Sequence, residues 1–95
     1  MKVGELLELV EEAIGDLKVA IVANQMRSFE SPYTSLEFTQ RAVELQEDLD
    51  ELVKLRDRLL ELDPEINAEE VFEKTELEKL IEYLTLLRES KSYLY

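Results

Sequence analysis

The chain has 95 residues, enough for one domain that folds without disulfide bonds or bound metals, and too few for a second domain. It contains no cysteine and no histidine, which excludes disulfides, thiol chemistry, imidazole general bases and nearly all zinc or copper sites. With 23 acidic against 11 basic residues, its net charge of −12 argues against binding to nucleic acid or to an anionic membrane.

The composition favours helix along the whole chain. Glycine and proline occur only twice each, while Leu, Glu, Lys and Ala are common, and no segment alternates polar and apolar residues over the length of a strand. We therefore expect an all-α fold in a single helical domain covering residues 1–95. No apolar run is long enough for a signal peptide or a membrane span, so we expect a cytoplasmic protein.

The first helix is expected over residues 3–27. Its apolar stripe follows the helical period and comprises Val3, Leu6, Leu7, Val10, Ala13, Ile14, Leu17 and Ile21. In the second half of the helix the opposite side is apolar as well, through Val19, Val22, Ala23 and Met26. A helix that is apolar nearly all round requires cover on both sides, so these four residues indicate an additional packing surface.

The second helix is expected over residues 36–62, after a loop that contains Phe29 and Tyr33. Thr34 and Glu37 have the spacing of a capping box. We expect the two loop aromatics to plug the end of the core, with a contact surface as the alternative. The stripe of this helix comprises Phe38, Ala42, Leu45, Leu49, Leu52, Val53, Leu59 and Leu60, while Leu36 and Val43 lie off it.

The third helix is expected over residues 68–92, starting at Asn67 as N-cap. Thr75 and Glu78 repeat the capping-box spacing, so the helix is either bent near residue 75 or preceded by a short separate helix. Its stripe comprises Leu77, Leu80, Ile81, Leu84 and Leu87, with Tyr83, Leu86 and Tyr93 to one side.

Two arrangements satisfy these patterns: an antiparallel three-helix bundle, and a long helical hairpin crossed by the third helix. In the bundle, apolar residues outside the stripes gather at the end that carries the first loop. We expect a homodimer, or a higher homo-oligomer, to cover them there; a different protein partner and internal cover by the third helix are the alternatives. The expected interface residues are Val19, Val22, Ala23, Met26, Leu36, Val43, Tyr83, Leu86 and Tyr93.

Two pairs of carboxylates invite a metal-dependent alternative. Glu8 with Glu11, and Glu47 with Asp50, resemble the E-x-x-E and E-x-x-D pairs with which all-α nucleoside triphosphate pyrophosphohydrolases hold Mg²⁺. The resemblance implies an Mg²⁺-dependent hydrolase with these four residues as metal ligands. However, the four side chains project away from the apolar stripes that join their helices, whereas a metal site needs them to converge. We therefore predict a non-enzymatic protein with no catalytic residue, cofactor or metal site.

The high negative charge also permits an acidic inhibitor that imitates nucleic-acid phosphates and occupies a basic site on a target protein. Asn24, which lies within the apolar stripe of the first helix, has two interpretations. It pairs with its copy in an oligomer, or, as we expect, it bonds a nearby backbone group.

Overall fold

The computed structural model describes the backbone of residues 1–94 and the side chains of residues 1–89. Within that range it contains three α-helices, α1 (Val3–Arg27), α2 (Ser35–Leu60) and α3 (Lys74–Leu94), and a single 3-10 turn, η1 (Ala68–Glu70). The all-α prediction is thus confirmed. The third helical segment is interrupted, because η1 is separate from α3, and α2 ends two residues before the end expected from the sequence.

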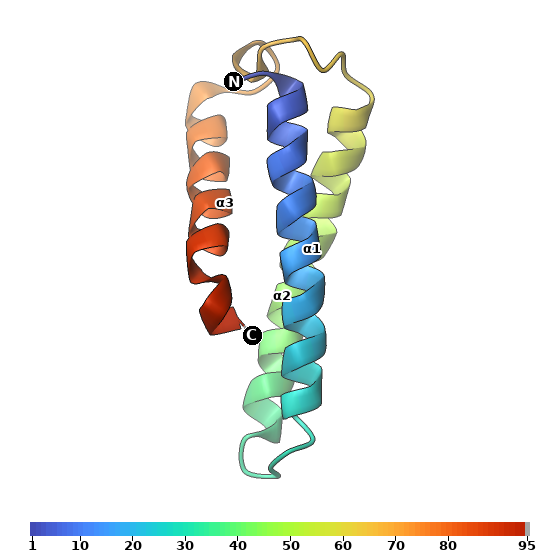
Figure 1. The fold of residues 1–95 in the computed structure, drawn as a ribbon, viewed down its shortest axis with the longest axis vertical. Helices are drawn as coiled ribbons and strands as arrows, with labels where there is room; N and C mark the ends of the chain where they lie inside the picture. Colours follow the sequence, from blue (N-terminus) through green and yellow to red (C-terminus); the bar gives the residue numbers. More distant parts are fainter. Residues whose placement is uncertain (95) are drawn as a thin grey trace.

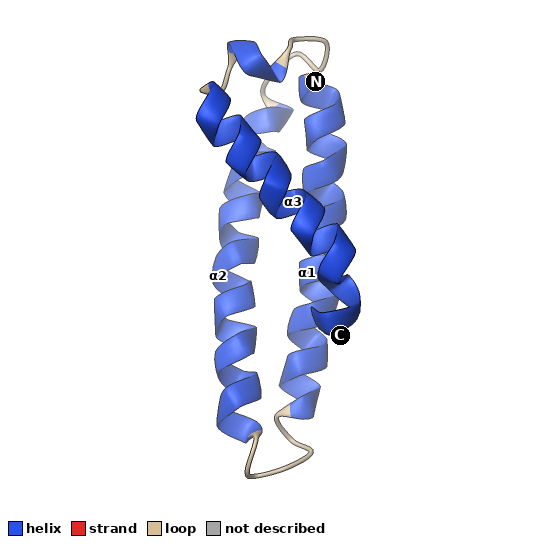
Figure 2. Cartoon of the chain, turned by 90° about the vertical axis from the view of Figure 1, so that its left-hand side faces the viewer, coloured by secondary structure: helices blue, strands red, loops and turns tan. Residues whose placement is uncertain are grey.

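Helices α1 and α2 form a long antiparallel hairpin that runs the full length of a molecule measuring 49 × 21 × 18 Å (Figure 1). Helix α3 returns from the opposite end, packs mainly on α1 and crosses the hairpin obliquely (Figure 2). It stops short of the hairpin loop (Figure 1). The structure is therefore the crossed hairpin, in which α3 covers only the part of α1 and α2 that is distant from this loop.

The core follows the apolar stripes of the three helices. Leu6, Val10 and Leu17 of α1 are fully shielded from solvent, as is Leu59 of α2. The same cluster includes Leu77, Leu84 and Leu87 of α3. Leu60 is the exception among the stripe residues, with 57% of its surface exposed at the last residue of α2.

The start of α1 is tied to the connection between α2 and α3. The first backbone amides of a helix have no partner within it. Here the Val3 amide donates to the Ile66 carbonyl at 2.8 Å, and the Gly4 amide donates to the Pro64 carbonyl at 3.0 Å. In the other direction, the Ala68 amide donates to the Met1 carbonyl at 2.8 Å. These bonds fix where the chain turns towards α3.

The capping predictions for α2 and for the turn at Asn67 are wrong. Thr34 and Asn67 precede α2 and η1 as expected, but neither side chain accepts a hydrogen bond from the following turn. The Glu37 carboxylate accepts a hydrogen bond from Arg41 Nη2 at 2.6 Å instead of reaching back to Thr34. An ion pair one turn along the helix therefore replaces the capping box.

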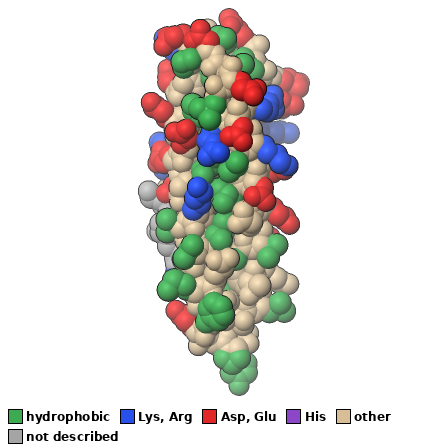
Figure 3. Space-filling view, turned by 90° about the vertical axis from the view of Figure 1, so that its right-hand side faces the viewer, with side chains coloured by type: hydrophobic (Ala, Val, Ile, Leu, Met, Phe, Trp, Pro, Cys, Tyr) green, Lys and Arg blue, Asp and Glu red, His purple; other side chains and the backbone are tan. Residues whose placement is uncertain are grey.

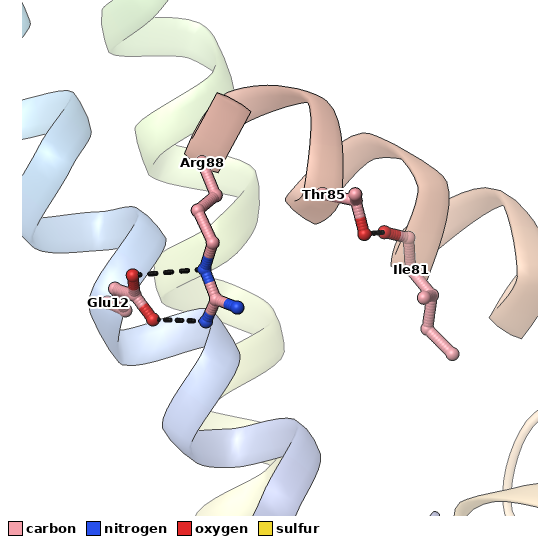
Figure 4. A network of polar contacts seen from close by, with 4 residues as sticks. All are labelled: Glu12, Ile81, Thr85 and Arg88. Carbon is pink, nitrogen blue, oxygen red and sulfur yellow. Dashed lines mark hydrogen bonds and ion pairs between the residues drawn. The ribbon is translucent and has the colours of Figure 1, made fainter. Parts of the chain in front are cut away.

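The far end of α3 is attached halfway along α1. Figure 4 shows Arg88 of α3 reaching Glu12 of α1, with Nε 3.2 Å from Oε1 and Nη2 2.6 Å from Oε2. The hydrogen bond to Glu12, followed by the charge of that carboxylate, raises the pKa of the Arg88 guanidinium. This bidentate contact joins α3 to α1 at the level of Glu12.

Candidate interaction surface

The hairpin extends beyond α3 as a pair of helices joined by the first loop. We call residues 17–46 the hairpin arm, and residues 1–16 with 47–95 the body. The arm contains only three basic and three acidic residues, Lys18, Arg27, Arg41, Glu30, Glu37 and Glu44. It is therefore electrically neutral, and the whole net charge of −12 belongs to the body.

The surface shows the same division. On the face drawn in Figure 3, acidic and basic side chains concentrate in the upper half of the molecule. Hydrophobic side chains stand out along both edges of the lower half and at its tip. Among the residues whose side chains are described, most of the exposed large apolar side chains therefore belong to the arm.

The arm carries six of the nine interface residues expected from the sequence. Val19, Val22 and Met26 of α1 are more than half exposed, as are Leu36 and Val43 of α2, and Ala23 is partly buried. Val19, Val22, Ala23 and Met26 line a shallow hollow of about 480 Å³ together with Lys18. Internal cover by the described side chains of α3, which end at residue 89, therefore does not reach these residues.

The tip of the arm is apolar as well. Phe29 is 88% exposed and Tyr33 is 96% exposed. The prediction that these aromatics plug the end of the core is wrong, because both side chains stand in solvent. An open hollow of about 550 Å³ lies between the end of α1 and the start of α2, with Phe29 among its lining residues. The alternative interpretation, a contact surface, fits their exposure.

Of the other three expected residues, Leu86 and Tyr83 are not part of this group. Leu86 lies within one turn of Arg88, which contacts Glu12, and the helical rise places Glu12 roughly 20 Å from Met26 along α1. Tyr83 is partly buried and lines a groove between α2 and α3. Tyr93 lies outside the described side chains. The sequence analysis put all nine residues at one end because periodicity does not show how far along α1 the third helix reaches.

Asn24 is buried in the arm, with 3% of its surface exposed. Its Nδ2 donates a hydrogen bond to the Ala20 carbonyl one turn earlier in α1, at 2.8 Å. This is the local backbone bond expected from the sequence.

The groove between α2 and α3 has a volume of about 570 Å³. The Tyr83 hydroxyl lies at its side, shielded from solvent and without a hydrogen bond among the described residues. Burial, and then the negative charge of Asp48, raise the pKa of this phenol. The groove is bordered by both acidic and basic side chains, so its charge selects no class of ligand.

The carboxylates of the possible metal site do not converge. Glu8, Glu11, Glu47 and Asp50 are all exposed, and Asp50 accepts a hydrogen bond from Gln46 at 2.9 Å. Among residues 1–89, no three acidic side chains are grouped so that they could hold a metal ion.

No helix in the described part of the chain is long and apolar enough to cross a membrane. Comparisons of the chain with protein-family models, curated proteins and solved structures give no match.

Proposed function

We propose that this chain is a non-enzymatic protein that associates with a second copy of itself through the hairpin arm. One observation carries the proposal. The hairpin arm, which the described side chains of α3 leave uncovered, exposes apolar side chains and has no net charge. Burial of apolar surface is the main driving force of most protein association, and the neutrality of the arm keeps an excess of like charges out of the contact itself.

The size of the apolar surface supports this proposal. From the exposed fractions of Val19, Val22, Met26, Leu36, Val43, Phe29 and Tyr33, the arm exposes on the order of 700 Å² of apolar side chain or more. The largest patch on a typical monomer is roughly 300–600 Å², whereas a standard interface buries roughly 800 Å² per partner. These side chains lie on both helices and at the tip, so the area is a total for the arm and not one contiguous patch. It is close to the area that one partner buries in a standard interface.

Sedimentation equilibrium tests the proposal with a matched pair of variants. Val22 and Leu60 are similarly exposed, at 54% and 57%, but Val22 lies in the arm and Leu60 at the opposite end of the hairpin. The wild type should sediment as a dimer at micromolar concentration. Val22→Glu should be monomeric, because the dimer would bury a carboxylate without a partner, whereas Leu60→Glu should remain dimeric.

Three results would contradict the proposal: a wild type that stays monomeric at high micromolar concentration, a Val22→Glu variant that remains dimeric, and equal weakening of the dimer by both substitutions. Circular dichroism of each variant verifies that the helices are intact. This control separates dissociation from unfolding.

A second candidate is the acidic inhibitor. The observation in its favour is that the body alone carries the net charge of −12, so one end of the molecule presents carboxylates while the other presents apolar side chains. Binding of a basic target by the body should weaken steeply as salt is added, whereas association through the arm should not.

A further inference from the structure

The exposed stripe on α1 has a spacing that reads the same in both directions. Its members are Val19, Val22, Ala23 and Met26, separated by three, one and three residues. When such a stripe meets a copy of itself running antiparallel, Val19 lies opposite Met26 of the second copy, and Val22 lies opposite its Ala23. Each contact is then repeated by the two-fold axis, as in an isologous interface.

The four side chains also provide a suitable shape. They line an open, shallow depression on the side of α1 that faces away from the core. Ala23 is the smallest of them, and small residues allow close approach of a facing side chain. A Val22 side chain from a second copy, placed opposite Ala23, would pack against this depression.

Charge decides between the two directions in which a second copy could lie. Towards the start of α1, the outer side continues from Val19 into exposed carboxylates such as Glu5 and Glu8. In a parallel pair these residues would lie beside their own copies, with the helix axes roughly 8–10 Å apart. Like charges at that distance repel each other.

In an antiparallel pair the bodies lie at opposite ends. With the axis between Val22 and Ala23, the acidic first halves of the two α1 helices, which end at Asp16, are separated by 13 residues, roughly 20 Å at 1.5 Å per residue. That separation exceeds twice the Debye length of about 8 Å at physiological ionic strength, so the repulsion is largely screened.

We propose that two copies pair through α1 of the hairpin arm, antiparallel, about a two-fold axis that passes between Val22 and Ala23. This inference rests on the proposed self-association and adds its direction and register. The result is an elongated dimer with the neutral arms in the centre and an acidic body at each end.

Engineered disulfides test the register, because the native chain has no cysteine to interfere. Positions 19 and 26 are two turns apart on one helix, about 10 Å along its axis. Disulfides join Cα atoms at most about 7 Å apart, so these positions cannot be linked within one chain. A bond between them must therefore connect two chains.

The experiment compares the single variants Val19→Cys and Met26→Cys, alone and mixed, under mild oxidation. The mixture should give a covalent heterodimer, while each variant alone should give much less covalent dimer. Leu60→Cys, at the far end of the hairpin, measures the background of random collision.

Two other patterns of disulfide formation would overturn the inference. Linking of Val19→Cys to itself would show a parallel pair. Linking of Val43→Cys to itself, without a 19–26 bond, would place the interface on α2. Sedimentation of the same samples after reduction separates the two proposals: a dimer without the 19–26 bond refutes only this arrangement, and a monomer refutes both.

Discussion

The two glycines of α1 lie in opposite surroundings, so alanine at each position should change stability in opposite directions. Gly15 is in the middle of the helix. Apart from its chain neighbours and the backbone of its own helix, no atom of the described residues lies within 4 Å of the position that a Cβ would occupy. Glycine inside a helix is about 1 kcal/mol less favourable than alanine. We therefore expect Gly15→Ala to raise the free energy of unfolding by roughly 0.5–1 kcal/mol.

Gly4 lies in the first turn of α1, against the connection between α2 and α3. A Cβ there would come within 3.1 Å of Pro64 Cβ, which is closer than ordinary van der Waals contact. Pro64 cannot easily move away, because its carbonyl accepts a hydrogen bond from the Gly4 amide. The hydrogen bond from the Val3 amide to the Ile66 carbonyl holds the same segment in place. Overpacking of this kind costs roughly 1–3 kcal/mol, so Gly4→Ala should lower the free energy of unfolding.

Thermal unfolding followed by circular dichroism measures both effects, at one protein concentration because association shifts the midpoint. For a domain of this size, 1 kcal/mol corresponds to roughly 4–8 °C in Tm. Gly15→Ala should therefore melt a few degrees above the wild type and Gly4→Ala below it. A lower Tm for Gly15→Ala would mean that α1 is packed closely at this position. A gain for Gly4→Ala would mean that the connection does not press on α1.

Three further outcomes follow from the structure. The far-ultraviolet circular dichroism spectrum should be dominated by helix, and a substantial strand signal would overturn the fold. Addition of Mg²⁺ or Mn²⁺ should leave Tm unchanged, and nucleoside triphosphates should not be hydrolysed. The reason is that the four candidate carboxylates, two on α1 and two on α2, face solvent. A metal-dependent rise in Tm would revive the pyrophosphohydrolase alternative. Tyr83→Phe should be at least as stable as the wild type near pH 7, since it removes a shielded hydroxyl without a hydrogen bond among the described residues. Because folding raises the pKa of Tyr83, the wild type should lose stability as the pH rises above about 10, the pKa of an unfolded tyrosine. Thermal melts of both proteins across that pH range should show a smaller loss of stability for Tyr83→Phe.

The sequence alone determined the helical fold and most of the core. Apolar residues recurring with the helical period identify the buried side of each helix, because neighbours three and four residues apart share one face. Val3, Leu6, Val10 and Leu17 are buried as that pattern indicates. The local bond of Asn24 was also predictable, since its partner Ala20 lies one turn away in the same helix.

The exposed residues of the arm were predictable for the same reason. Val19, Val22 and Met26 lie opposite the core stripe of α1, and this depends only on their spacing. Nothing in the sequence, however, could show that Tyr83 and Leu86 lie far from them.

The tertiary structure decided how α3 lies on the hairpin. Periodicity shows which side of a helix is apolar, but not how far along that side a neighbouring helix reaches, or at what angle it crosses. Here α3 packs into the core through Leu77, Leu84 and Leu87. Contacts between residues distant in sequence accompany this packing: the Arg88 side chain with Glu12, and the Gly4 amide with Pro64. Such contacts depend on the positions of whole helices in space, and they leave the arm uncovered.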